Sequence, residues 1–164
     1  MWECADRNAA LARQIPALEA QLAVACGLRL PVILHNRKAW PEFFAVWRRL
    51  AAGSITGVCH HFTGGREILR EALDLGLHIS FCGPVTYANA RRIREAAAFV
   101  PPDRILTETD APDLPAAPFL GGRSEPCHVS AVLAELAAIR KTPVEELAAT
   151  VAANYRRVLN LPPD

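Results

Sequence analysis

The chain has 164 residues, enough for one domain with a sizeable hydrophobic core. Apolar residues make up 51% of it and charged residues 21%, a composition that excludes an intrinsically disordered chain. The net charge of +1 excludes a strong basic field over the whole molecule, so composition neither requires nor excludes nucleic-acid binding.

The cysteine content indicates a reducing environment. There are five cysteines and no CxxC spacing, which argues against a disulfide framework or a cysteine zinc site. Cys59 and Cys82 lie inside apolar runs, where buried free thiols are expected. We therefore expect a cytoplasmic protein. No apolar run approaches the roughly twenty residues that span a bilayer, so no membrane partner is expected.

Helices and short apolar strands are predicted to alternate along the chain. A helix is expected over residues 7–26, before Gly27, and a buried strand over 31–35. Three more helix–strand units follow, with helices at 41–51, 66–75 and 88–99 and strands at 55–60, 77–81 and 104–109. Strands separated in this way predict βαβ units and a parallel sheet. Two or three helices are expected after His128, and the absence of a linker predicts a single domain over residues 1–164.

Polar residues stand where the predicted strands end. His35, His60 and Asp110 follow three different strands, and Ser80 and Gly83 mark the same end of a fourth. The carboxyl edge of a parallel α/β sheet is where chemistry is usually carried out, above all in a barrel. One histidine there would more often be structural, but three equivalent positions predict a metal-dependent hydrolase with one active site.

Several motifs extend this interpretation to a family. They are PVILH at 31–35 with Arg37 and Ala39, VCHHFTG at 58–64, GPVTYA at 83–88, LTETDAP at 106–112 and RSEP at 123–126. Together they resemble TatD-type deoxyribonucleases, and the likeness covers roughly residues 3–160. These enzymes are metal-dependent hydrolases of the amidohydrolase type, built on a TIM-like barrel.

The resemblance implies a pair of divalent metals, Mg, Mn or Zn, at the mouth of the barrel. By motif, His35 and His60 would ligate one metal, while Asp110 would bind the other or act as general base toward water. Glu3 is the best match to the glutamate that bridges the two metals. Metal-activated water would then hydrolyse phosphodiester bonds, with DNA ends as the expected substrate.

Other residues near these motifs have two interpretations each. Glu108 precedes Asp110 by two positions, so both side chains point to the same side of a strand. Glu108 would either orient a ligand or substrate, or pair with a cation such as Arg123. His61 is interpreted as a packing residue on the face opposite His60. Arg123 would contact a substrate phosphate, or tether its loop through Glu125.

The sequence departs from the family pattern at its start. It has no His-x-His pair, and residues 1–6 resemble the family's fourth strand without its glycines. We therefore expect a partial TIM-type (β/α) barrel with about strands four to eight of eight, followed by C-terminal helices. A truncated gene product, a second polypeptide that supplies the missing strands, or a homo-oligomer paired through open barrel edges would each account for this. One metal in place of two would then be possible.

Two alternatives to deoxyribonuclease activity remain open. The chain could be a catalytically impaired barrel fragment that acts as an interaction or assembly partner. It could also hydrolyse another ester or amide bond, because related barrels change substrate through their loops.

Overall fold

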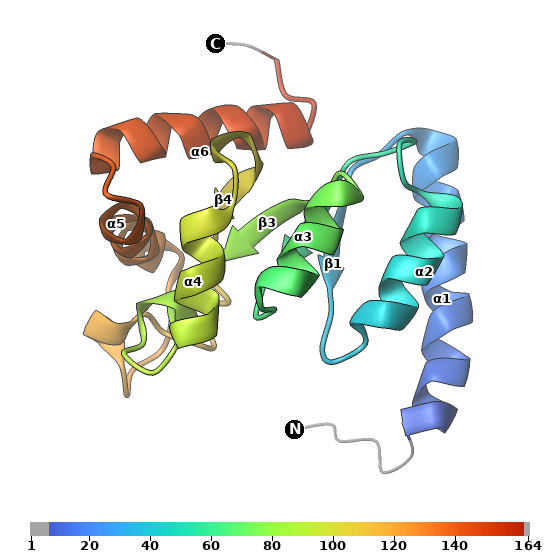
Figure 1. Cartoon of the computed structure of the whole chain (residues 1–164), viewed down its shortest axis with the longest axis horizontal. Helices are drawn as coiled ribbons and strands as arrows, with labels where there is room; N and C mark the ends of the chain where they lie inside the picture. Colours follow the sequence, from blue (N-terminus) through green and yellow to red (C-terminus); the bar gives the residue numbers. More distant parts are fainter. Residues whose placement is uncertain (1–6, 163–164) are drawn as a thin grey trace.

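The computed structural model describes residues 7–162, and it contains a four-stranded parallel sheet. Figure 1 shows the sheet among the surrounding helices. The strands are β1 (Val32–His35), β2 (Gly57–His60), β3 (His78–Phe81) and β4 (Ile105–Thr107), in the order β1-β2-β3-β4. Every neighbouring pair is parallel, so the predicted parallel sheet is confirmed. The strand expected at residues 1–6 lies outside the described residues.

The predicted alternation of helices and strands is also confirmed. The helices are α1 (Arg7–Leu28), α2 (Trp40–Leu50), α3 (Arg66–Asp74), α4 (Arg91–Phe99), α5 (Val129–Arg140) and α6 (Val144–Val158). Short 3-10 turns occur at η1 (Gly83–Thr86), η2 (Pro102–Arg104), η3 (Ala117–Phe119) and η4 (Pro126–His128). In Figure 1, α1 and α2 lie side by side at one end of the molecule, with α5 and α6 at the other. Within residues 7–162, no helix combines the length and apolar character that crossing a membrane requires.

One face of the sheet forms the main hydrophobic core with the helices. Leu34, Cys59, Ile79 and Ile105 lie in one register row across the four strands, and all are buried. They belong to the same apolar cluster as side chains of α2, α3, α4 and α5. At Gly57, an added Cβ would lie 2.5 Å from the Trp47 ring, so this close approach of strand and helix requires glycine.

The opposite face is covered only in part. Helix α6 packs there, because Val158 and Tyr155 contact Val58 of β2 and Leu106 of β4. The Asn154 amide donates hydrogen bonds to the carbonyls of Ile105 and Pro102, at 2.9 and 2.7 Å. On β1, by contrast, Ile33 is 68% exposed. The apolar surface of this face is therefore buried beside β4 and open beside β1.

The long connection from β4 to α5 folds back onto the turn after β3. The carbonyl oxygen of Leu114 lies so close to Gly83 that an added Cβ would be 2.0 Å from it. The Tyr87 hydroxyl donates to the carbonyl of Pro115 at 2.9 Å, and the Thr86 hydroxyl accepts from the backbone N–H of Ala117 at 2.7 Å. These contacts place the connection beside the carboxyl ends of the strands.

Candidate metal centre

His60 lies between two carboxylates at the end of β2. Its Nδ1 is 2.9 Å from Oε1 of Glu108, and its Nε2 is 3.1 Å from Oδ1 of Asp110. The three side chains are largely buried, with exposed fractions of 21%, 15% and 30% for His60, Glu108 and Asp110. The predicted neighbours His60 and Asp110 therefore do meet, although about fifty residues separate them in the sequence.

This arrangement fits a cation. A neutral imidazole carries one N–H, so it can donate to only one of the two carboxylates. If Nδ1–H donates to Glu108, the Nε2 lone pair faces an oxygen of Asp110, and a second proton or a metal ion must lie between them. Two ligands bound to one metal at about 2.1 Å lie roughly 3.0–3.4 Å apart. The 3.1 Å between Nε2 and Oδ1 has that spacing.

His35 lies next to His60, as predicted from the strand ends. The two residues are register partners on β1 and β2, with ring centroids 5.8 Å apart. The His35 side chain is exposed, so it can turn toward a ligand shared with His60. The expected bridging ligand Glu3 lies outside the described residues, which leaves His35, His60 and Asp110 as the candidate ligands that the structure places.

Glu108 is positioned by the sheet to hold His60. Its backbone N–H donates to the carbonyl of Phe81 at 2.9 Å, which continues the β3–β4 pairing beyond the last residue of β4. Its carboxylate then accepts from His60 and from the backbone N–H of His61, the latter at 2.5 Å. The alternative pairing of Glu108 with Arg123 is wrong, since no such contact occurs among the described residues. Glu108 contacts the ring of His60, and its role in orienting a ligand stays a prediction.

His61 is not a packing residue on the opposite face, and that interpretation was wrong. Its φ of +49° ends the alternation of the strand, so its ring turns to the same side as His60. Its Nδ1 lies 3.7 Å from Oδ2 of Asp110. Burial lowers the pKa of His61, and nearby Asp110 acts in the opposite direction. Two adjacent histidines after an apolar strand were the only signal that could have indicated this.

The residue after β3 also belongs to the site. Cys82 is buried as a free thiol, as expected, and its pKa is raised by burial and then by the charges of Glu108 and Asp110. Cys59, on the core face, is likewise buried, and burial raises its pKa to about 12. Both thiols are therefore protonated at neutral pH. Cys82 was predicted as buried but not as a neighbour of the carboxylates; its position directly after a strand was the available signal.

Arg123 and Glu125 lie beside a hollow of about 420 Å³ next to the centre. Its lining consists of Ala111, Pro112, Arg123, Ser124, Glu125 and Pro126. Arg123 is exposed, and in the described part of the chain it makes no ion pair with Glu125, so the predicted tether is wrong. Glu125 instead forms a capping box with His128. Because Ala111 and Pro112 directly follow Asp110, the hollow adjoins the candidate ligands.

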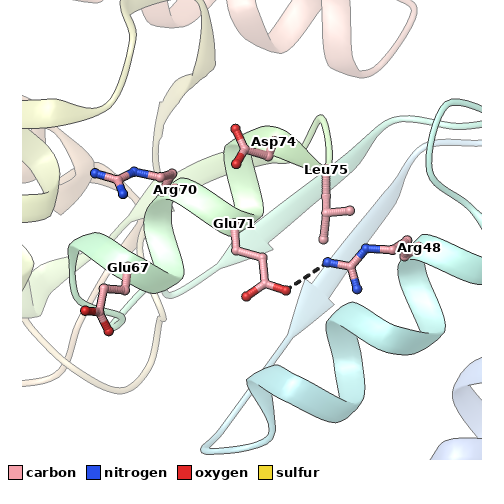
Figure 2. Close-up of a pocket in the computed structure, with 6 residues that line it drawn as sticks. All are labelled: Arg48, Glu67, Arg70, Glu71, Asp74 and Leu75. Carbon is pink, nitrogen blue, oxygen red and sulfur yellow. Dashed lines mark hydrogen bonds and ion pairs between the residues drawn. The ribbon is translucent and has the colours of Figure 1, made fainter.

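A second hollow, of about 380 Å³, lies between α2 and α3 (Figure 2). Its lining is charged, and Arg48 pairs with Glu71 at 2.9 Å across it. None of the predicted site residues lines it. Opposite charges there pair with each other on an exposed surface, so we assign it no function.

Comparison with known proteins decides the family. The family model described as TatD related DNase matches residues 3–160. The chain belongs to the TatD family. It is 40% identical over 134 residues to an uncharacterized metal-dependent hydrolase, YcfH, of Escherichia coli, covering 82% of this chain. It is 36% identical over 156 residues to the 3'-5' ssDNA/RNA exonuclease TatD of Erwinia amylovora, covering 91% of this chain.

Solved TatD structures share the fold. The crystal structure of the TatD homologue YjjV from Escherichia coli superimposes with a TM-score of 0.88 and 31% identity, covering 96% of this chain. A TatD-family hydrolase from Entamoeba histolytica has the same fold at 19% identity and a TM-score of 0.77. The chain spans about half the length of its relatives: 51% of the Escherichia coli YcfH, and 60% of the Erwinia protein and of the YjjV structure.

Proposed function

We propose that this TatD-family protein hydrolyses phosphodiester bonds at DNA ends, with a divalent metal held at the carboxyl edge of the sheet. The observation that carries the proposal is His60, with Glu108 at one ring nitrogen and Asp110 at the other. A histidine whose second nitrogen donates to a carboxylate is a recurring feature of metal sites, where that carboxylate fixes the ring.

The residues present would hold such a metal through His60, His35 and Asp110, with Glu3 as a further proposed ligand. Imidazole and carboxylate donors suit Zn or Mn, whereas Mg prefers oxygen ligands. The metal, when bound, lowers the pKa of a coordinated water and neutralises charge on the phosphodiester. Glu108 keeps the Nδ1–H of His60 occupied and thereby leaves Nε2 free to bind. One metal or two would be compatible with this set.

Asp110 is proposed as the general base. Its Oδ1 lies beside His60, while its Oδ2 is 3.7 Å from Nδ1 of His61, beyond normal hydrogen-bond length. That second oxygen can therefore accept the proton of an attacking water. Arg123, at the rim of the adjoining hollow, has no carboxylate partner among the described residues and would bind a substrate phosphate, with Glu125 on the same lining.

The substrate class rests on one relative and on the chemistry of the hollow. The Erwinia amylovora protein is named a 3'-5' ssDNA/RNA exonuclease, so single-stranded DNA ends are the first substrate to test. We further propose that residues 1–164 form a single unit that corresponds to strands four to eight of a TIM-type barrel. A cytoplasmic location is proposed from the free thiols that the structure describes.

The decisive experiment measures nucleotide release from end-labelled single-stranded DNA with Mg, Mn or Zn added to the metal-free chain. His60→Ala and Asp110→Asn should abolish metal-dependent release. Asp113→Asn, a matched change three residues away at an exposed position, should leave it unchanged. Glu108→Gln should weaken metal affinity by about 10–100-fold, while Glu95→Gln, in an exposed pair with Arg91, should not. Full activity of His60→Ala would refute the assigned role.

A second candidate function is favoured by the exposed face of β1. Ile33 is 68% exposed on the face that also carries His35, and no partner strand flanks β1 among the described residues. An open strand edge beside apolar surface is typical of a pairing surface. If the chain serves as an assembly partner, it should bind no stoichiometric metal at His35, His60 and Asp110 and should form oligomers in size-exclusion chromatography. If it cleaves another ester or amide, a substrate panel with metal will show that activity without DNA cleavage.

A further inference from the structure

A second set of metal-ligand atoms lies in η4, the turn before α5. It is separate from the candidate metal centre of His35, His60 and Asp110, called the strand-end centre below. Glu125, Cys127 and His128 each offer one ligand atom, and these atoms lie within 4.8 Å of one another. Within residues 7–162, no other three His, Cys, Asp or Glu side chains bring their ligand atoms this close together. It combines a carboxylate, a thiol and an imidazole from a four-residue stretch, and neither the sequence motifs nor the proposed hydrolysis gives Cys127 or His128 a role.

We propose that Glu125, Cys127 and His128 bind a zinc-class divalent cation. The donor types are those that zinc prefers, and three protein ligands leave one position for water or another ligand. For Zn–S of about 2.3 Å and Zn–O of about 2.0 Å, tetrahedral geometry places sulfur and oxygen roughly 3.5 Å apart. The Cys127 Sγ lies 3.7 Å from Oε2 of Glu125, so this pair already has the required spacing.

The ring of His128 is held in place from one side. It stacks on Phe119 with ring centroids 3.6 Å apart and an interplanar angle of 5°. Its Nδ1 accepts a hydrogen bond from the backbone N–H of Glu125 at 3.1 Å. Metal binding has to replace that bond, because the metal either uses the Nδ1 lone pair or, at Nε2, leaves the proton on Nδ1. The site therefore exchanges a capping contact for a metal bond.

Binding of the cation would release one proton and would take place at the protein surface. Cys127 contacts Glu125 as a thiol, and on metal binding its proton is released to solvent while sulfur bonds the cation. Both Glu125 and Cys127 are exposed, so the cation can enter directly from water. Since Glu125 also lines the hollow beside Arg123, a cation bound there adds positive charge to its rim.

Cobalt(II) distinguishes this site from the strand-end centre, because a thiolate ligand gives an intense near-ultraviolet charge-transfer band that His and Asp ligands do not. The tag-free chain, kept reduced and without oxygen, is titrated with cobalt(II) and the band is measured. In the unaltered chain and in His60→Ala, we expect the intensity of the band to saturate at one equivalent of cobalt(II). Cys127→Ser should remove it, and His128→Gln should weaken cobalt affinity by about tenfold or more.

The matched control is Cys82→Ser, which removes the thiol nearest the strand-end carboxylates and should leave the band unchanged. Zinc should displace cobalt and slow the labelling of Cys127 by a thiol reagent. A missing band in the unaltered chain, or a band of equal strength in Cys127→Ser, would overturn the proposal. Neither result depends on hydrolysis, so the test is independent of the proposed nuclease activity.

Discussion

Lowering the pH should destabilise this fold through His78. The residue is 3% exposed on the α6-covered face of the sheet, and burial, followed by the charges of Arg104 and Arg157, lowers its pKa from 6.5 to about 4. Asp103 and the backbone of Gly57 act in the opposite direction but more weakly. Above pH 6.5 the ring is neutral in both the folded and the unfolded chain. Below that, the unfolded chain binds a proton that the folded chain does not, so stability falls until about pH 4.

The size of this effect follows from the two pKa values. The complete loss amounts to about 3 kcal/mol, and roughly 2 kcal/mol of it is reached at pH 5. The assay is urea unfolding of the unaltered chain and of His78→Leu at pH 7.5 and pH 5. The variant should lose about 2 kcal/mol less between the two pH values, whatever its stability at pH 7.5. His35→Gln, a change at an exposed histidine, should behave like the unaltered chain. An equal fall in His78→Leu would refute the reasoning.

Three further substitutions test the packing that positions the site. Gly83→Ala should lower the free energy of unfolding by about 1–3 kcal/mol or more, because the new Cβ meets the Leu114 carbonyl; an unchanged urea midpoint would contradict this. Asn154→Ala leaves two carbonyls of η2 and β4 without their side-chain donor and should cost about 2–3 kcal/mol by the same assay, whereas a loss near zero would mean that water replaces the amide. Trp47→Ala should cost about 3–5 kcal/mol, and a loss below 1 kcal/mol would show that the core collapses around the cavity.

The sheet could be predicted because its strands are short and apolar and are separated by helices. Strand β4, for example, is buried on both faces, and its sequence is largely apolar. The ends of the elements were less predictable. The expected strand at 55–60 begins at Gly57, where the ring of Trp47 packs against the backbone. That contact joins a helix to the strand that follows it, and the periodicity of neither element contains it.

The site residues could be predicted from the strand ends only where the backbone stays regular. His35 and His60 are neighbours because parallel strands keep them in register, and Glu108 and Asp110 share a side because the chain stays extended after β4. His61 was missed because a positive φ breaks the alternation at that residue. The partner of Glu108 could not be predicted either, because whether its carboxylate contacts a histidine or an arginine depends on how a loop folds.

The irregular residue at the end of β2 links the fold to the chemistry. A regular strand would turn His61 away from His60, and Glu108 would then hold only a ring nitrogen. The left-handed turn instead brings the backbone N–H of His61 to the same oxygen of Glu108 that His60 contacts. Two donors on one carboxylate oxygen fix its position, and that position fixes which nitrogen of His60 faces Asp110. The orientation of the candidate ligand thus depends on one backbone torsion beside it.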